Sequence, residues 1–531
     1  MSVDINNAAF QDALNLIQYT RQSVFLTGKA GTGKSTFLRY VCEHTKKKHV
    51  VLAPTGIAAI NAGGSTMHSF FKLPFYPLLP DDPNLSLQRG RIHEFFKYTK
   101  PHRKLLEQIE LVIIDEISMV RADLIDAIDR ILRVYSHNLR EPFGGKQLLL
   151  VGDVFQLEPV VKNDEREILN RAYPTPYFFS ARVFSQIDLV SIELQKVYRQ
   201  TDSVFVSVLD HIRTNTAGAA DLQLLNTRYG SHIEESEADM YITLATRRDT
   251  VDSINEKKLA ELAGEPITFE GSIEGDFPES SLPTSQELVL KPGAQIIFIK
   301  NDFDRRWVNG TIGVIAGIDE EEETIYVITD DGKECDVKRE SWRNIRYRYN
   351  EKTKEIEEEV LGSFTQYPIR LAWAITVHKS QGLTFSRVVI DFTGGVFAGG
   401  QAYVALSRCT SLDGIQLKKP INRADIFVRP EIVNFAGRFN DRQAIDKALK
   451  QAQADVQYAA AARAFDKGDM EECLEQFFRA IHSRYDIEKP VPRRLIRRKL
   501  GIINTLQEQN KKLKEQMREQ QERLRQYAHE Y

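Results

Sequence analysis

The sequence is poor in cysteine, in long apolar runs and in excess charge of either sign. Its four cysteines are scattered over 531 residues without the close pairing of a metal site, so we interpret them as reduced thiols of a cytoplasmic protein. No apolar run reaches membrane-spanning length, and the first residues lack the basic-then-apolar pattern of a signal peptide. The formal net charge of −3 excludes a uniformly basic surface. Any nucleic-acid site must therefore be a local groove.

The most informative segment is 28–35, which reads Gly-Lys-Ala-Gly-Thr-Gly-Lys-Ser, the full pattern of a phosphate-binding loop. An apolar stretch at 23–27 precedes it and a potential helix follows. The glycines let successive backbone N–H groups point at a phosphate, Lys34 adds positive charge, and Ser35 offers a hydroxyl to Mg²⁺. A chance match is the alternative, and the strand–loop–helix context argues against it. The sequence therefore predicts binding of a nucleoside triphosphate.

At this length the chain is expected to form three or four domains. Short apolar strands alternate with helical stretches over 1–190, which is the pattern of a parallel α/β sheet. A second α/β unit is expected to begin near Ile192. Short β-like runs separated by Gly and Asp turns predict a small antiparallel barrel. The expected domains are 1–190 with an insertion at 72–100, then 191–269 joined to 361–435, the barrel at 270–360, and a helical extension at 436–531.

Three segments differ from this α/β pattern. Four prolines between 72 and 83 exclude regular structure and predict a rigid surface excursion. Residues 456–485 have the spacing of one tetratricopeptide-like unit, or equally of an ordinary helical hairpin. From Ile503 to Tyr531, side chains recur every three and four residues, with Asn510 and another polar residue in the seam. This tail is either a dimerising coiled coil or one solvated helix of a monomer.

Three polar side chains follow predicted strands of the first unit. Asp115 and Glu116 end the apolar stretch 111–114. After a phosphate-binding loop, such an Asp typically holds Mg²⁺ and such a Glu polarises the attacking water. The alternative is a helix start, because acidic side chains favour first turns. Gln156, within 152–159, could hydrogen-bond the γ-phosphate or its water, although Gly-Asp there is also an ordinary turn.

Two arginines could reach the same phosphate from the second unit. Arg199 and Arg408 would supply positive charge to the transition state of phosphoryl transfer. The alternative for each is a surface ion pair, the usual place of an arginine.

Small donors and aromatic residues gather in three other segments: 53–56, 64–71 and 376–384. Hydroxyl, amide and lysine groups can hold phosphodiester oxygens while aromatic rings stack on bases, which suits single-stranded nucleic acid. The alternative for Phe70 and Phe71 is core packing, expected for one of the two. His68 and His378 lack neighbouring ligands, so no metal role is expected for them.

In this order, the segments resemble the motifs of superfamily one helicases of the Pif/RecD-like branch, and look most like those of a bacterial Pif-type DNA helicase. The resemblance covers about 1–435. It implies two tandem RecA-like P-loop domains with an inserted Src-homology-3-like β-barrel. It also implies ATP-driven 5′→3′ movement on single-stranded DNA and unwinding of duplexes, forks and G-quadruplexes. The segments that carry it are 28–35, 53–71, 115–119, 152–159, 197–200, 307–311, 371–384 and 403–408.

The resemblance also implies a role for each matched residue. The catalytic residues would be Lys34 on the phosphates, Glu116 as base, Gln156 as sensor, and Arg199 and Arg408 as arginine fingers. ATP would be bound by Gln11, which reads adenine, and by Gly28, Ala30, Gly31, Thr32, Gly33, Lys34, Ser35, Thr36, Gln381 and Gly382, with Mg²⁺ on Ser35 and Asp115. The DNA path would be lined by Pro54, Thr55, Gly56, His68, Ser69, Phe70, Thr376, His378 and Lys379.

The implied partners are single-stranded DNA and duplex junctions in the bacterial cytoplasm, at the nucleoid, with no membrane. The proline-rich stretch 72–83 falls where the family has its strand-separating wedge. The basic segment 493–499 either adds DNA contacts or is a solvated face. Three other functions stay open: a translocase without unwinding, an ATP-gated DNA-binding protein, and a scaffold with a regulatory ATPase.

Overall fold

The computed structural model describes residues 4, 7–87, 91–198, 200, 202–230, 240–304, 306–484 and 490–529. The chain forms two compact units, Met1–Ile445 and Asp446–Tyr531. Two parallel α/β sheets and several antiparallel strands make up the first unit, and helices make up the second. The predicted fold class is therefore confirmed.

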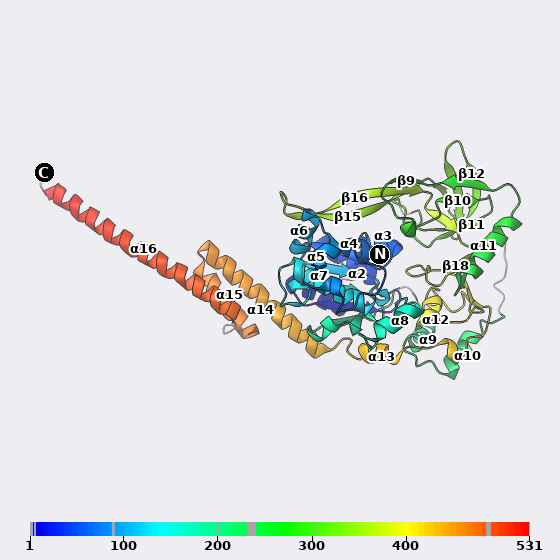
Figure 1. The fold of residues 1–531 in the computed structure, drawn as a ribbon, viewed down its shortest axis with the longest axis horizontal. Coiled ribbons are helices and arrows are strands. Elements are labelled where there is room, and N and C mark those ends of the chain that lie inside the picture. The colour runs from blue at the N-terminus through cyan, green and yellow to red at the C-terminus, as the bar shows by residue number, and fades with distance from the viewer. Residues whose placement is uncertain are drawn as a thin grey trace. The chain divides into compact units, whose positions relative to one another are not determined.

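The first sheet has six parallel strands in the order β3-β2-β4-β5-β1-β6, with helices around it (Figure 1). Several of its strands are buried along their whole length, which is why they read as continuous apolar runs. The strands are β1 (Val24–Gly28), β2 (His49–Ala53), β3 (Ser65–Thr66), β4 (Leu111–Ile114), β5 (Gln147–Val151) and β6 (Val190–Leu194). The helices are α1 (Ala8–Tyr19), α2 (Lys34–His44), α3 (Gly56–Ala62), α4 (Met67–Phe71), α5 (Arg91–Phe96), α6 (Lys100–Gln108), α7 (Ala122–Tyr135) and α8 (Asn163–Asn170).

The edge strand β6 differs from expectation. A second α/β unit was expected after residue 190, but β6 pairs in parallel with β1 from Val190 to Leu194. The first sheet therefore extends through Leu194. The apolar pattern of this strand fits either sheet, and only its pairing partner, about 165 residues away, decides between them.

The second sheet brings together strands that are far apart in the sequence. Its order is β18-β7-β19-β20, and all pairs are parallel. The strands are β7 (Ile242–Ala245), β18 (Ala374–Thr376), β19 (Val388–Asp391) and β20 (Ile415–Leu417). The accompanying helices are α9 (Ser203–Arg213), α10 (Ala219–Asn226), α11 (Arg248–Glu261) and α12 (Gln401–Leu406). The next helix, α13 (Pro430–Ala436), packs instead on the core of the first sheet, where the Phe435 ring lies 5.6 Å from that of Phe25.

Antiparallel strands fill the interval between β7 and β18. A five-stranded sheet has the order β14-β13-β12-β11-β17, and a pair joins β8 to β10. These strands are β8 (Ile267–Glu270), β10 (Glu287–Leu290), β11 (Gln295–Phe298), β12 (Ile312–Asp319), β13 (Thr324–Thr329), β14 (Glu334–Val337) and β17 (Ile369–Leu371). A second, three-stranded sheet consists of β15 (Glu340–Asn350), β16 (Glu355–Gln366) and β9 (Ser272–Gly275).

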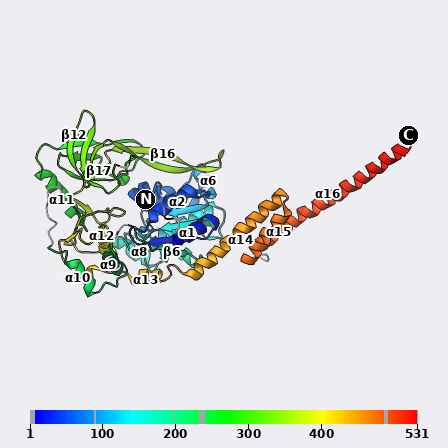
Figure 2. The same ribbon diagram turned by 180° about the vertical axis from the view of Figure 1, so that it is seen from behind.

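The hairpin β15–β16 also departs from the expected barrel at 270–360. Figures 1 and 2 show it as a long ribbon that runs from the small sheets to α6 of the first α/β unit. Its Tyr347 hydroxyl accepts a hydrogen bond from the backbone N–H of Val51 at 3.3 Å. The inserted strands therefore continue past residue 360 and contact the first sheet. The alternation of buried Tyr347 and Tyr349 with exposed arginines was a local sign of this strand.

The C-terminal unit consists of helices. A helical hairpin of α14 (Arg442–Lys467) and α15 (Met470–Ser483) turns at Gly468, and α16 (Pro490–His529) follows. Asp469 caps α15 by accepting from the N–H of Glu472 at 3.1 Å. Among the described helices of the chain, none combines the length and apolarity needed to cross a membrane.

The boundary expected at 435/436 lies too early. The Phe439 ring lies 5.8 Å from that of Phe25 in the first sheet. Asn440 exchanges hydrogen bonds of 2.8 and 3.2 Å with the backbone of Glu193. Residues 436–445 therefore belong to the first compact unit.

Candidate nucleotide and DNA sites

The phosphate-binding loop joins β1 to α2, as the sequence predicted. Gly31 and Gly33 have φ of 78° and 90°, a left-handed conformation that a side chain would strain. Gly33 is also the N-cap of α2, so the loop leads directly into a helix N-terminus. The Lys34 ammonium donates to the carbonyls of Gly28 and Lys29 at 2.7 and 3.0 Å. This places the lysine charge inside the loop.

Asp115 and Glu116 follow β4. Glu116 has a left-handed backbone with φ of 49°, and its N–H donates to the Asp115 carboxylate at 2.9 Å. A non-glycine residue in this conformation is held by its surroundings and is typical of functional sites. Burial, with the neighbouring Asp115 charge, raises the pKa of Glu116 to about 7, while Lys34 and Arg408 oppose the rise. Burial also raises the pKa of Asp115.

A cavity of about 1160 Å³ collects most of the predicted nucleotide residues. From the first α/β unit it is lined by Ala30, Gly31, Thr32, Gly33, Lys34, Ser35, Thr36, Asp115, Glu116 and Gln156, and from the second half of the chain by Gly382 and Arg408. Gln11, Gly28 and Gln381 are not among its lining residues. Gln11 lies next to Phe10, which does line the cavity, and Gln381 lines a smaller cavity together with Lys379.

The cavity also has lining residues that the motif reasoning did not assign. Asp330 and Thr384 are examples. Asp330 lies in the β insertion and directly follows β13, so its position depends on long-range pairing and carries no local signal. Thr384 belongs to the segment 376–384, whose hydroxyls were assigned only to DNA.

Of the two candidate arginine fingers, Arg408 lies within the described residues and is buried. Arg408 is 1 % exposed and follows α12. Its guanidinium donates to the Val404 carbonyl at 2.9 Å and to the Ser407 hydroxyl at 3.0 Å. It is thus held by its own α/β unit while it faces the cavity. Arg199 lies outside the described residues.

The expected DNA residues fall into exposed and buried groups. Thr55, Ser69 and Lys379 are exposed, and the hydroxyl of Thr376 accepts from the N–H of Lys379 at 3.2 Å. Pro54, Gly56 and His378 are partly buried. The exposed groups lie at the carboxyl ends of β2 and β18 or at short helices that follow strands.

Phe70 is corrected. It is 3 % exposed and packs edge-on against Phe71, so it presents no face to a base. Both phenylalanines belong to the core, because α4 is short and packs its apolar side onto β2 and β3. An exposed ring lies close by: Phe75, 82 % exposed, stacks on His68 with ring centroids 4.9 Å apart.

Among the described residues, no group of three or more His, Cys, Asp or Glu side chains could hold a metal ion by itself. The Ser35 hydroxyl and the Asp115 carboxylate both line the cavity. Oxygen ligands of this kind suit Mg²⁺, which usually keeps several waters and takes further oxygens from a bound phosphate. The donor set therefore fits a nucleotide-bound Mg²⁺.

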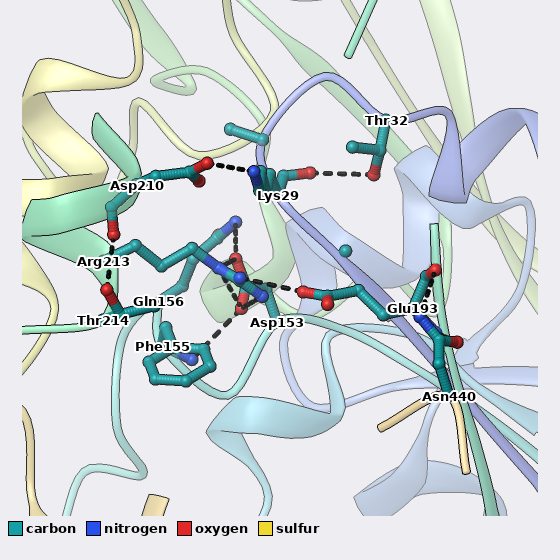
Figure 3. A network of polar contacts seen from close by, with 12 residues as sticks. Lys29, Thr32, Asp153, Phe155, Gln156, Glu193, Asp210, Arg213, Thr214 and Asn440 are labelled. Carbon is teal, nitrogen blue, oxygen red and sulfur yellow. Dashed lines mark hydrogen bonds and ion pairs between the residues drawn. The ribbon is translucent and has the colours of Figure 1, made fainter. Parts of the chain in front are cut away.

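No local sequence motif indicates the contacts that join the two α/β units. The Tyr403 hydroxyl of α12 accepts from the Ala30 N–H of the phosphate loop at 3.0 Å. Lys29 of the same loop is paired with Asp210 of α9, and Arg213 of α9 is paired with Asp153 (Figure 3). Only the tertiary fold brings these residues together.

Comparison with known proteins identifies the family. A sequence profile of the PIF1-like helicases matches residues 5–217. The ATP-dependent DNA helicase Pif1 of Campylobacter jejuni is 33 % identical over 412 residues, covering 74 % of this chain and 88 % of its own length. The chain belongs to the PIF1-like helicase family. The prediction of a Pif-type, ATP-dependent DNA helicase is thereby confirmed.

Solved structures of other PIF1-like helicases agree. Pif1 from Bacteroides sp in complex with ADP-AlF4 is 41 % identical and matches 82 % of this chain and 97 % of its own with a TM-score of 0.75. Bacteroides Pif1 bound to single-stranded DNA is 40 % identical, with a TM-score of 0.59 over 83 % of this chain and 99 % of its own.

Proposed function

We propose that this PIF1-like helicase hydrolyses ATP in the cavity between its two α/β units and uses the cycle to move along DNA. The observation that carries this proposal is the convergence of Lys34, Glu116, Gln156 and Arg408 on one cavity from both units. Groups that must act together on a γ-phosphate need such an arrangement.

In this mechanism each residue has one task. The loop N–H groups and Lys34 hold the phosphates, and Glu116 takes a proton from the attacking water. Arg408, with Arg199, stabilises the charge that develops on the transferred group. Gln156 hydrogen-bonds the water or the γ-phosphate. Gln11 is the proposed adenine reader, because its neighbour Phe10 on α1 and the N-cap residue Asn7 line the cavity wall.

Ser35 and Asp115 would hold Mg²⁺, which neutralises phosphate charge when bound. A raised pKa suits Glu116 for its task, since a general base works best when its pKa lies near the ambient pH.

The domains implied by this mechanism follow the two sheets. We assign a first RecA-like domain through Leu194 and a second one formed by 202–261 and 374–426, because Ile426 is the last residue in the core of the second sheet and α13 packs on the first. The β insertion lies between them, and the helical unit follows. Closure of the two α/β domains around ATP would shift their DNA contacts relative to each other.

The proposed DNA path runs over both α/β units. Thr55, Ser69, Thr376 and Lys379 offer donors for phosphodiester oxygens, and His68 with exposed Phe75 offers a stacking surface. Pro54, Gly56 and His378 border these groups. The direction of movement is 5′→3′, and the substrates include forks and G-quadruplexes of nucleoid DNA in the bacterial cytoplasm.

The deciding experiment is an unwinding assay with matched 5′-tailed and 3′-tailed duplexes, with and without Mg²⁺ and ATP. Unwinding of the 5′-tailed duplex alone, dependent on both, is expected. Unwinding of the 3′-tailed duplex would contradict the polarity, and ATP turnover without unwinding of either would favour the translocase.

We propose that the proline-rich stretch 72–83 separates the strands. Phe75 and Tyr76 are exposed there, at 82 % and 50 %. Tyr76→Ala should lower unwinding severalfold while DNA-stimulated ATP turnover stays within twofold of the parent. Val160→Ala, which removes a 71 % exposed side chain elsewhere on the first unit, is the control. Equal unwinding by both variants would refute the wedge.

We propose further that α16 pairs with α16 of a second copy. Its seam residues Leu506, Leu513, Met517 and Leu524 are all more than half exposed. They occupy heptad core positions, and Asn510 occupies an a position, where a buried asparagine favours a parallel two-stranded coil. Sedimentation of the full chain should show a dimer that Leu513→Glu abolishes. A monomer at micromolar concentration would contradict this.

A further inference from the structure

Helix α9 contacts two loops of the first α/β unit: the phosphate-binding loop and the loop that carries Gln156. Asp210 and Arg213 lie three residues apart, on one face of the helix. Asp210 is paired with Lys29 in the phosphate loop, and Arg213 is paired with Asp153 in the loop that carries Gln156. Figure 3 shows both pairs side by side. One rigid helix of the second α/β unit therefore reaches two loops of the first α/β unit.

The contact of Arg213 is buried and has several parts. Its Nε donates to both carboxylate oxygens of Asp153 at 3.3 and 3.2 Å, and its Nη2 donates at 3.0 Å. Its Nη1 lies 2.8 Å from a carboxylate oxygen of Glu193. The guanidinium also lies over the Phe155 ring, 4.5 Å from its centroid. The arginine as a whole is only 3 % exposed.

Asp153 in turn organises the loop that ends in Gln156. Its carboxylate accepts from the N–H of Phe155 at 3.2 Å, and the Gln156 side-chain amide lies 3.5 Å from it. Its carbonyl accepts from the N–H of Gln156 at 2.9 Å. A displacement of the Asp153 carboxylate would therefore be transmitted to Gln156 through these bonds.

Stability alone is a weak reason for this arrangement. A buried ion pair pays a desolvation cost that often equals its attraction, and well-packed apolar side chains of the same volume are frequently as stable. The bidentate geometry instead fixes the direction and position of the carboxylate. The geometry of the Arg213–Asp153 pair points to alignment of the loop that carries Gln156.

We propose that Arg213 is a positioning residue that ties the Gln156 loop to α9, so that movement between the two α/β units changes the position of Gln156 at the γ-phosphate. This inference rests on the proposed role of Gln156 as sensor. Misplacement of a catalytic group by about 1 Å can lower a rate by about a hundredfold.

The test compares Arg213→Lys with Arg133→Lys. Arg133 also makes a buried ion pair within α7: its Nε donates to both carboxylate oxygens of Asp129 at 2.9 and 2.8 Å. Arg213→Lys should lower the DNA-stimulated kcat at least tenfold while KM and the affinity for a fluorescent ATP analogue stay within threefold. Arg133→Lys should lower the unfolding temperature without this kcat loss. Unchanged kcat in Arg213→Lys, or an equal loss in Arg133→Lys, overturns the proposal.

Three further single variants and one double variant complete the design. Asp153→Asn and its combination with Arg213→Lys should lose no more kcat than the larger single loss, because both act on one contact; multiplied losses refute the coupling. Phe155→Leu keeps the charges paired and should lower kcat to a smaller degree, which keeps the test open if Arg213→Lys does not fold. An unchanged kcat in Phe155→Leu counts against the proposal.

Gln156→Ala separates the sensor role of Gln156 from its coupling to α9. If it keeps full turnover, the sensor role fails. If it loses turnover while Arg213→Lys does not, only the coupling fails.

Discussion

Glu116→Gln should both abolish ATP turnover and stabilise the protein in a pH-dependent way. Burial and Asp115 raise the pKa of this carboxyl to about 7 from an ordinary 4.5. Between these pH values the folded chain binds more protons at this site than the unfolded chain does, so stability falls as the pH rises from 4.5 to 7. Above pH 7 the whole cost of the buried carboxylate is present.

The size of the effect follows from the two pKa values. At about 1.4 kcal/mol for each pH unit, their difference corresponds to about 3 kcal/mol at pH 8. Glutamine carries no charge at either pH, so the variant should recover up to this amount at pH 8 and almost none at pH 4. In a compact unit that extends to Ile445, about 3 kcal/mol raises the unfolding temperature by roughly 3 °C.

The assay is thermal unfolding of parent and variant at both pH values without nucleotide, with ATP turnover measured in parallel. Glu43→Gln, an exposed carboxyl of α2, is the control and should change neither quantity. Parent turnover should also fall about tenfold for each pH unit below about 7, because a protonated base accepts no proton. Equal stabilisation at pH 4 and 8 would refute the burial argument, and retained turnover in Glu116→Gln would refute the base.

Three shorter predictions concern other contacts. Arg408→Lys should lower kcat at least a hundredfold and KM less than threefold, measured by steady-state turnover. Gly400→Ala should lower kcat more than tenfold, because its methyl group would meet the Phe155 carbonyl at 2.2 Å; Gly395→Ala, also at positive φ but in open space, should not. Ending the chain at 436 rather than 445 should cost about 2–3 kcal/mol on unfolding, through loss of the Phe439 and Asn440 contacts.

Local pattern was sufficient where the chemistry itself is local. The phosphate loop, Asp115 and Glu116 each follow an apolar strand, and the structure has those strands at β1 and β4. The strands β2 and β13 are likewise short apolar runs bounded by turns, which are local signals.

Long-range pairing decided what the sequence left open. β6 could belong to either sheet, and its place beside β1 depends on a partner far away in the chain. Phe70 has the same local sequence environment whether it faces a base or the core, and its burial depends on Phe71 and on Tyr347 from the hairpin. Gln11 matches the motif in sequence, but the residues at the start of α1 that line the cavity are Phe10 and the N-cap residue Asn7.

Arg213 shows that one such contact did leave a trace in the sequence. The buried side chains of α9 are Phe205, Val208, Leu209 and Ile212, a stripe with helical spacing, and Arg213 continues it four residues after Leu209. A charged side chain in an apolar stripe is costly unless an opposite charge is buried with it. The stripe therefore predicts a buried carboxylate facing α9, and the Gly-Asp segment at 152–153 supplies it. The segment that reads as an ordinary turn before Gln156 is thus one of the contacts that join the second α/β unit to the first.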